Sequence, residues 1–492
     1  NDDPHHWTYK APGLVAWSLI FGIGYTLTEY PTVALFAVRL LGVYVLLRVM
    51  VAVVFYPVGL YQIRRTLKFV QGQKCMPAPR AVHHVVIIPN YNEPVELLAR
   101  TLDSLSRQSC ARRRLIVVLA MEAAEPGALA KGRCLRKRYA AKFAHLLVTV
   151  HPANLPNEAP GKAANQRWAA RQARNMLDEQ PGLSIDWTTL TSCDADSRLH
   201  PAYFETVARS FAATPERHHS FWQSPLRFDN NIWRVAAPVR VLTLLANVVN
   251  LSELANPFMP KLTQSTYTLS YRLAERIDYW DGCVIAEDSN ILLRALFATG
   301  GRVTVRPVML PTQGDAVAGD DLWQTMRNFY RQRMRHAWGC QNLGYILQQW
   351  NRHEGITLSQ KLLYLLQVLQ DYTLFATAAF VLGISWFFGF VITGSPVISF
   401  FHLAIPAYFF VALNLLGAVS TWVIWGGEHI RCAHSVFGWR PSHLIADVVT
   451  WCVMPVITLT LAVAPVLHAN TRMLIGGRIR FVRTEKEGAR IG

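Results

Sequence analysis

The sequence predicts an α/β domain, in which strands alternate with helices, inserted between transmembrane helices at both ends of the chain. Three observations lead to this fold class. Of the 492 residues, 51% are hydrophobic and only 16% are charged, which is too apolar for an ordinary soluble enzyme. Long apolar runs lie near both ends, and most charged residues lie between them. The central part carries short β-branched runs that alternate with helical patterns, which indicates a mostly parallel sheet covered by helices.

The N-terminal region, residues 1–69, is expected to contribute two transmembrane helices. A polar turn separates its apolar stretches Leu14–Leu27 and Val33–Leu60, and a span needs about 20 largely apolar residues. Arg39 and Arg48 lie in the second stretch, where a charged group must face protein, water or lipid headgroups. The segment that follows is basic, with Arg64, Arg65 and Lys68. The positive-inside rule therefore places the central domain in the cytoplasm.

Residues 70–312 have no comparable apolar run and form the predicted α/β domain. Four strands are expected, at His84–Pro89, Arg114–Ala120, Leu146–Val150 and Thr188–Cys193. Helical patterns cover Glu96–Ser106, Ala163–Met176 and Ile291–Phe297. Ligands of such sheets bind beyond the carboxyl ends of the strands. The polar loops that follow the strands are therefore the candidate site.

The C-terminal part is read as amphipathic interfacial helices over residues 313–371, including Lys361–Gln370, and as spans over residues 372–470. Three stretches are long enough to cross a bilayer: Tyr372–Thr393, Val397–Trp425 and Leu444–His468. Three crossings from the cytoplasm would export residues 471–492, yet these are strongly basic, which favours the inside. Either one stretch crosses incompletely or the number of spans differs. The two prolines of the last stretch make it the candidate for a bent or re-entrant helix.

The formal net charge of +17 fits three partners: nucleic acid, an anionic membrane surface or a phosphate-bearing substrate. The basic stretches carry no zinc-finger spacing and no RNA-binding aromatic signature, so nucleic acid is the weakest of the three. A surface close to anionic lipid explains most of the charge. The eight cysteines are scattered without a CxxC pair, which is typical of a reducing compartment.

The sequence Asp194-Ala195-Asp196 directly follows the fourth predicted strand. Two carboxylates at alternate positions of an extended chain can divide their duties between a divalent cation and a ribose hydroxyl. Mg²⁺ and Mn²⁺ favour such oxygen ligands beside substrate phosphates. A solvated loop has the same composition, so this motif alone is weak.

Two further loops occur earlier in the chain than the Asp194-Ala195-Asp196 sequence. Ile88–Pro94 follows the first strand and is either a polar binding loop or a turn stabilised by asparagine side chains. Pro160–Asn165 contains a Gly-Lys pair that opens a helix, and both a helix N-terminus and a lysine favour phosphate. The spacing of a P-loop is absent. A helix start with a surface lysine explains the same residues.

Two constellations lie later in the chain. Glu287 and Asp288 begin a helix, where an acidic residue is ordinarily a cap but can also accept a proton from an attacking hydroxyl. The segment Gln332–Gly339 reads QRMRHAWG. Its arginines suit a diphosphate and its aromatic ring a sugar, although a basic interfacial helix needs neither.

In this order, the five constellations resemble those of the processive and lipid-linked inverting family 2 glycosyltransferases of GT-A fold, which include cellulose, chitin and hyaluronan synthases. The resemblance runs from about His83 to Gly339, together with the flanking spans. IIPNYNEP is similar to the opening strand and loop, PGKAAN to the Gly-Lys helix and CDAD to the metal motif. AED stands where TED is usual, and QRMRHAWG where QxxRW is usual. The Met121-Glu122 pair resembles a bacterial branch of the family.

The resemblance implies a role for each matching residue. The nucleotide pocket would be lined by Tyr91, Glu93, Glu122 and Lys162. Asp194 would bind the ribose or the metal, and Asp196 the metal, Mg²⁺ or Mn²⁺. Asp288 would be the general base, with Glu287 beside it in the catalytic motif. Gln332 and Arg335 would hold the diphosphate of the donor.

Two parts of the resemblance concern the acceptor and the tail. The usual tryptophan after the motif's arginine is His336 here, with Trp338 two residues further on, so either side chain is a candidate to contact the acceptor. The segment FVRTEK in the C-terminal tail is similar to the FxVTxK gating segment of bacterial cellulose synthase. That similarity implies gating roles for Phe481, Thr484 and Lys486, although a plain basic tail has the same composition.

The expected function is transfer of a sugar from a nucleoside-diphosphate sugar, first of all a UDP-sugar, to a polysaccharide or a membrane lipid. The expected location is the bacterial inner membrane, with several spans and a cytoplasmic catalytic domain. Membrane lipid is an expected partner, and nucleic acid is not. The alternative is a receptor or scaffold that binds a nucleotide or polyanion without catalysis. Such a protein would need neither Asp288 nor a metal.

Overall fold

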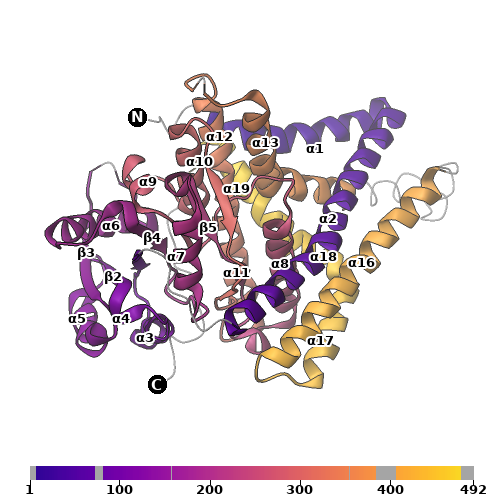
Figure 1. Ribbon diagram of the computed structural model, residues 1–492. Coiled ribbons are helices and arrows are strands. Elements are labelled where there is room, and N and C mark those ends of the chain that lie inside the picture. Colours follow the sequence, from indigo (N-terminus) through magenta and orange to yellow (C-terminus); the bar gives the residue numbers. More distant parts are fainter. Residues whose placement is uncertain (1–6, 73–80, 157, 354, 384–405, 478–492) are drawn as a thin grey trace.

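The computed structural model describes residues 7–72, 81–156, 158–353, 355–383 and 406–477. An α/β domain lies on one side of the molecule and a group of long helices on the other (Figure 1). Both parts were expected from the sequence. The arrangement that matters for function is the way in which the helices meet the domain.

The domain is built on a seven-stranded sheet with the order β3-β2-β1-β4-β7-β5-β8. The strands are β1 (His83–Pro89), β2 (Leu115–Glu122), β3 (His145–His151), β4 (Thr188–Ser192), β5 (Ser220–Gln223), β7 (Tyr267–Ser270) and β8 (Thr304–Pro307). Only β7 is antiparallel to its neighbours, β4 and β5. Two short strands, β6 (Leu226–Arg227) and β9 (Thr312–Gln313), pair separately in parallel. The four expected strands and the mostly parallel sheet are confirmed.

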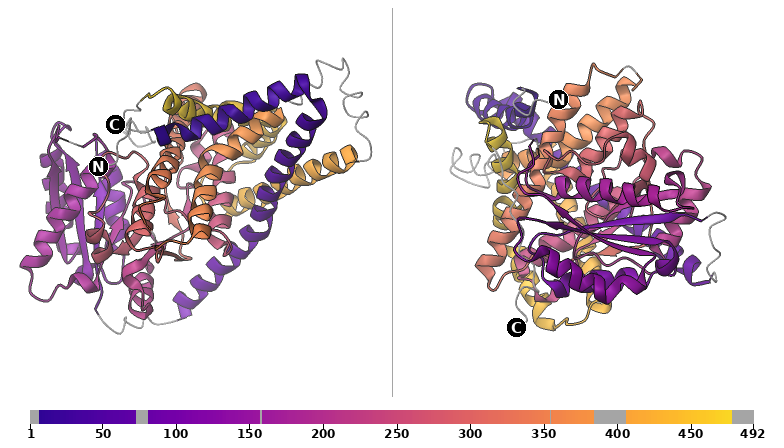
Figure 2. Two further views of the ribbon diagram at one scale, coloured as in Figure 1. Left: turned by 90° about the horizontal axis from the view of Figure 1, so that it is seen from above. Right: turned by 90° about the vertical axis from the view of Figure 1, so that its left-hand side faces the viewer.

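Helices cover both faces of this sheet, as Figure 2 (right) shows. One face carries α3 (Val95–Ser106), α5 (Ala128–Tyr139) and α7 (Tyr203–Ala213), and the other carries α6 (Lys162–Glu179) and α10 (Glu287–Ala298). Successive residues of β1 point to opposite faces, so Val85 and Ile87 pack with α6 while Val86 and Ile88 pack with α3. The strand is apolar throughout because both of its faces are buried.

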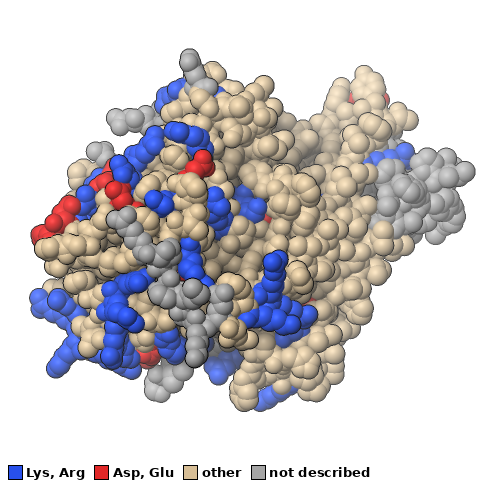
Figure 3. All heavy atoms as spheres, viewed as in Figure 1, with Lys and Arg blue, Asp and Glu red and all other residues tan. Residues whose placement is uncertain are grey.

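Four helical stretches of the described chain are long and apolar enough to cross a membrane: Trp7–Glu29, Thr32–Gly72, Leu358–Gly383 and Met454–Leu474. The first includes α1 (Ala11–Glu29), and the second belongs to α2 (Pro31–Gly72). Lys and Arg gather over the α/β domain, whereas the long helices at the right of Figure 3 carry few. Side chains such as Phe21, Phe36 and Leu47 are exposed on α1 and α2. These surfaces suit lipid, as expected of a membrane protein.

The C-terminal helices differ in detail from the expectation. Lys361–Gln370 is not a separate interfacial helix but part of a continuous helix of 26 residues, Leu358–Gly383. The first nine residues of Val397–Trp425 and residues 384–393 lie outside the described residues, and the rest of that stretch belongs to α16 (Pro406–Ser435).

The last expected span, Leu444–His468, is interrupted. The helix α17 (Pro441–Cys452) ends at Val453, and α18 (Met454–Ile457) begins with Pro455 in its first turn. Proline has no amide hydrogen to continue a preceding helix. The membrane-length stretch therefore starts at Met454 and continues through η8 (Thr458–Val463) and α19 (Ala464–Leu474).

The long helices are joined to the domain through α8 (Ala237–Ala255), which packs along α2. Arg48 of α2 lies 2.8 Å from Glu253 of α8 and 3.6 Å from Asp371. Of the three expected surroundings, protein, water or lipid headgroups, this arginine faces protein. Further along, Gly59 of α2 meets Leu251 of α8. A Cβ atom on Gly59 would lie 2.6 Å from the Cγ atom of Leu251, so the two helices approach closely because this residue has no side chain.

We expect Gly59→Ala to lower the thermal unfolding midpoint of the protein in detergent, because the added methyl group overlaps Leu251 and overpacking destabilises by about 1–3 kcal/mol. Gly22→Ala in α1 is the matched control, since nothing lies within 4 Å of a Cβ atom there. Alanine is the better helix former by about 1 kcal/mol, so the control variant should be as stable as the parent or more stable. Equal midpoints for the two variants would contradict the close packing of α2 on α8.

Candidate active site

The two aspartates of the DAD sequence follow β4 at the carboxyl edge of the sheet. Asp196 is buried, and its Oδ2 atom accepts a hydrogen bond of 2.9 Å from the backbone N–H of Asp315. Asp194 is more accessible, and its Oδ2 atom accepts a hydrogen bond of 2.5 Å from the hydroxyl of Ser265. Both carboxylates are therefore held in place by neighbouring loops.

One ammonium group brings three of the expected motifs together. The Nζ atom of Lys162, the first residue of α6, lies 2.9 Å from Asp194, 2.9 Å from Glu287 and 3.1 Å from Asp288. Glu287 and Asp288 form the first turn of α10. The Gly-Lys helix, the DAD loop and the AED helix start thus meet at a single point.

Ser265, which sequence reasoning missed, bridges two of these carboxylates. Its hydroxyl donates to Asp194, and its backbone N–H donates to Asp288 Oδ2 over 3.1 Å. Thr263, two residues earlier, donates its hydroxyl to the backbone carbonyl of Asp288. Ser265 has φ +48°, a conformation that is uncommon for residues other than glycine. Such residues cluster at functional sites, but no sequence pattern marks them.

Charge and burial set the protonation of this cluster. Burial acts to lower the pKa of Lys162, but Asp194, Asp288 and Glu287 outweigh it and raise that pKa well above its usual value. Burial and the neighbouring Glu287 raise the pKa of Asp288 well above the ordinary aspartate value, against the opposing effect of Lys162. A carboxylate with a raised pKa is a stronger base, and general bases are tuned in this way.

The loop after β1 carries Tyr91 and Glu93. It is held by Glu125, whose Oε2 atom accepts 2.8 Å hydrogen bonds from the Asn90 side chain and from the Asn92 backbone. Lys131 pairs with Glu125 and donates to the backbone carbonyl of Glu93 over 2.9 Å. Tyr91 remains exposed at the surface of this loop. The sequence did not single out Glu125, because the two asparagines that it binds, Asn90 and Asn92, lie more than thirty residues earlier in the chain.

Glu122, at the end of β2, contacts a buried histidine that the sequence did not single out. His151 at the end of β3 lies 3.1 Å from Glu122 through Nδ1 and 2.9 Å from Glu158 through Nε2. The hydrogen bond with Glu122 is the largest influence on the pKa of His151 and raises it, with Glu158 adding to the effect against burial. The imidazolium therefore fixes the orientation of both carboxylates.

The QRMRHAWG segment forms the end of α11 (Leu322–Ala337) and η6 (Trp338–Cys340). Gln332 and Arg335 are half-buried, His336 is exposed, and Trp338 is buried. Trp338 packs against α1 and α19 in a cluster that contains Ala16, Val466, Ala469 and Met473. The segment also approaches α10, because Gly339 lies against the ring of Tyr372, whose hydroxyl is 3.4 Å from Ser289. Phe481, Thr484 and Lys486 lie outside the described residues.

The sequence of residues 190–466 matches the profile of the glycosyl transferase family group 2. The chain belongs to this family. It is a glycosyltransferase, and its domain has the GT-A fold. No curated protein sequence matches the chain.

Two solved structures are among those similar to this chain. The mannosyltransferase PcManGT from Pyrobaculum calidifontis, in complex with GDP-Man and Mn²⁺, is 16% identical, with 86% of this chain and 98% of that chain covered and a TM-score of 0.45. TarS 1-349 from S. aureus, in complex with UDP-GlcNAc, is 15% identical, with 62% and 80% covered and a TM-score of 0.35.

The carboxylate oxygens at the candidate site of the glycosyltransferase fit a divalent cation. Asp194 and Asp196 supply hard carboxylate oxygens, and a carboxylate has about four lone-pair sites. Asp194 accepts from Ser265 and contacts Lys162, and Asp196 accepts from Asp315. Within the described residues, no group of three or more His, Cys, Asp or Glu side chains could hold a metal ion. Mg²⁺ is commonly held by one or two carboxylates, with substrate phosphates and water completing its shell.

We expect Trp338→Ala to lower the thermal unfolding midpoint strongly and to reduce donor hydrolysis in parallel. Its side chain fills a buried interhelical site, and removing such a ring costs on the order of 3 kcal/mol. The exposed His336 is the control, because His336→Ala removes a side chain with little packing and should leave the midpoint near that of the parent. A Trp338→Ala protein of parental stability that fails only in acceptor transfer would instead assign Trp338 to the acceptor.

Proposed function

We propose that this glycosyltransferase moves a sugar, with inversion, from a nucleoside-diphosphate sugar to an acceptor hydroxyl, and that Asp288 is the general base. The observation that carries this proposal is the cluster at Lys162, where Asp194, Glu287 and Asp288 meet at the carboxyl edge of the sheet. A receptor or scaffold would gain nothing from three carboxylates held together, since like charges in close contact oppose folding.

The proposed reaction is a single displacement. Asp288 accepts the proton of the acceptor hydroxyl while the acceptor oxygen bonds to the anomeric carbon, and the bond from that carbon to the diphosphate oxygen breaks with both electrons going to the diphosphate. Gln332 and Arg335 bind the departing diphosphate. A divalent ion, Mg²⁺ or Mn²⁺, held by Asp194 and Asp196, would supply positive charge beside the phosphates. Preorganised charge at the point where charge develops is the largest source of rate acceleration in many enzymes.

The nucleotide is proposed to bind at the ends of β1 and β2. Tyr91 and Glu93 lie on the loop after β1, and Glu122 ends β2. This edge of an α/β sheet is where ligands ordinarily bind. Lys162 adds a positive charge between the proposed nucleotide site and α10. We propose a UDP-sugar as the first donor to assay.

The acceptor is proposed to arrive from the membrane side, as a polysaccharide end or a lipid-linked hydroxyl. A small cavity of about 30 Å³ lies between the domain and the long helices. Gln223 and Gln264 line it from the domain, and Arg48 and Asp371 from the helices. These amide and charged groups suit a hydroxylated acceptor. The exposed basic end of α2 favours a cytoplasmic domain, in a bacterial inner membrane.

We expect Asp288→Asn to lower turnover by about 10²-fold or more, since a general base commonly contributes that much, while donor affinity is retained. The variant should also unfold at a higher temperature at pH 7, because the raised pKa of Asp288 opposes folding at that pH and the amide does not titrate. A carboxylate whose pKa is raised on folding destabilises the protein only when the pH is above its pKa in the unfolded chain, about 4. The difference in unfolding temperature between Asp288→Asn and the parent should therefore shrink as the pH falls toward about 4.

Measuring product formation, donor binding and unfolding temperature on the same preparation tests this assignment. Asp103→Asn on α3 is a matched control, because it makes the same change at a half-exposed carboxylate beside Lys142 and should leave turnover near the parental value. Loss of donor binding in step with turnover in Asp288→Asn would make Asp288 a structural helix cap. Absence of any metal-dependent turnover in the parent, with several donors, would favour a scaffold.

We expect Asp196→Asn to abolish metal-dependent donor binding and turnover without unfolding the domain. Asparagine keeps a carbonyl oxygen to accept the hydrogen bond from Asp315 but removes the charge that attracts a cation. Calorimetric titration of nucleotide with and without Mn²⁺ measures the effect. Metal-dependent binding that persists in this variant would remove Asp196 from the metal site.

A further inference from the structure

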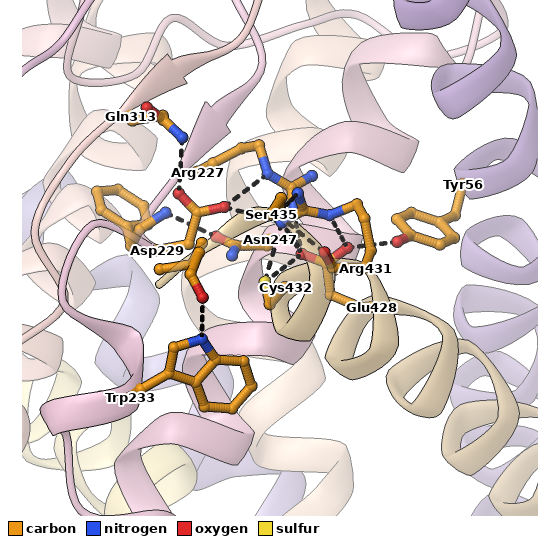
Figure 4. A network of polar contacts seen from close by, with 12 residues as sticks. Tyr56, Arg227, Asp229, Trp233, Asn247, Gln313, Glu428, Arg431, Cys432 and Ser435 are labelled. Atoms are coloured by element: carbon orange, nitrogen blue, oxygen red, sulfur yellow. Dashed lines mark hydrogen bonds and ion pairs between the residues drawn. The ribbon is translucent and has the colours of Figure 1, made fainter. Parts of the chain in front are cut away.

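A buried network of charges lies where the α/β domain meets α2 and α16 (Figure 4). Arg227 of β6 pairs with Asp229 through Nε at 3.1 Å and with Glu428 of α16 through its guanidinium. Arg431, one turn further along α16, lies 3.0 Å from Glu428 and 2.8 Å from Asp229. Tyr56 of α2 donates its hydroxyl to Glu428. Two cations thus neutralise two carboxylates, and three separate segments of the chain are joined.

Except for Arg431, whose side chain is 28% exposed, the charged groups of this network are shielded from solvent. Asp229 and Glu428 are fully buried, and Arg227 is 4% exposed. A charge removed from water in this way is stable only with its partner and with good hydrogen-bonding geometry. The relative position of β6 and α16 is therefore fixed by ion pairing as well as by apolar packing.

The same network holds the segment that follows β9. Gln313 pairs with Arg227 in the register of β6 and β9, and its side chain lies 3.5 Å from Asp229. The backbone N–H of Gly314 donates to the carbonyl of Arg227 over 2.8 Å. The Asn230 side chain then donates to Asp315 over 2.9 Å. Residues 313–315 are thus tied to both ends of the Arg227–Asn230 segment.

This segment in turn places the proposed metal ligand. The backbone N–H of Asp315 donates to Asp196, as described above. Arg198, two residues after Asp196, exchanges backbone hydrogen bonds of 2.7 and 3.0 Å with Gln313. Asp196 is therefore connected to α16 through one short strand pair, and no intervening side chain of this path is exposed.

We propose that the Arg227–Glu428 pair is a positioning element for Asp196, so that helix α16 sets the affinity of the catalytic site for its divalent ion. This inference rests on the proposed function, because it assumes a metal at Asp196. Partners that orient metal ligands from behind commonly change metal affinity by about 10–100-fold when they are removed. Here that partner comes from the long helices rather than from the catalytic domain.

A second buried ion pair in the same interface provides a matched control. Arg240 of α8 lies 2.6 Å from Asp447 of α17, and both side chains are as buried as those of the network. Its hydrogen bonds run to Asp447, to the backbone of Val235 and to the backbone of His443. Asp447 also lies 3.1 Å from His429 of α16. None of these partners belongs to the segment 313–315 or to the loop that carries Asp196.

The test compares Glu428→Gln with Asp447→Asn in the purified full-length protein in detergent or lipid nanodiscs. Mn²⁺ binding is measured by electron paramagnetic resonance in the presence of UDP, without turnover, beside the unfolding midpoint of each variant. Both variants should lose stability, because Asp447→Asn leaves the buried Arg240 without its carboxylate and Glu428→Gln leaves Arg227 and Arg431 to share Asp229. Only Glu428→Gln should weaken Mn²⁺ binding, by about tenfold or more. Equal Mn²⁺ affinities in the two variants would overturn the proposal.

Two further variants keep the test decisive. Tyr56→Phe removes only the hydrogen bond to Glu428 and should weaken Mn²⁺ binding by a smaller factor. It replaces Glu428→Gln if that protein does not fold. Parental Mn²⁺ affinity in a folded Tyr56→Phe would then count against the proposal. Asp196→Asn separates this inference from the function on which it rests. Mn²⁺ binding that survives in Asp196→Asn contradicts the metal assignment itself. Binding that is lost there but unaffected in Glu428→Gln contradicts only the role of α16.

Discussion

The structure of the site depends on the contact between the Lys162 ammonium and three carboxylates. One positive charge facing Asp194, Glu287 and Asp288 leaves an excess of negative charge at the edge of the sheet. Such an arrangement holds the start of α6, the end of β4 and the start of α10 in contact. It also remains attractive to further cations, as the proposed metal site requires. Burial and the same excess of negative charge raise the pKa of Asp288.

The junction between the domain and the long helices follows a related rule. Arg48 with Glu253, Arg227 with Glu428, and Arg240 with Asp447 each join the two parts. Apolar surfaces pack in many registers at similar free energy, whereas a buried charge tolerates only the register in which its partner is present. The orientation of the catalytic edge relative to the helices is therefore specified by these pairs.

The sequence predicted the parts of the fold that have a strong local pattern. The strand β1 is a run of β-branched residues buried on both faces, and the loop after β4 carries a motif whose place in the fold is fixed by topology. It did not predict β5 or β7, because strands of four residues carry too little pattern. Ser265 was missed since its backbone conformation has no signature. The Arg227–Glu428 pair joins positions 201 residues apart, and only the folded chain brings them together.

The segment Leu262–Ser265 shows how the two halves of the molecule act on one reaction. Leu262 and Gln264 line the cavity between the domain and the helices, while Thr263 and Ser265 contact Asp288. A single strip of backbone therefore forms the wall of the proposed acceptor cavity on one side and positions the proposed base on the other. In the proposed reaction, a displacement of the helices that reshapes the cavity also shifts the groups that hold Asp288, and this would couple the arrival of an acceptor to the geometry of the base.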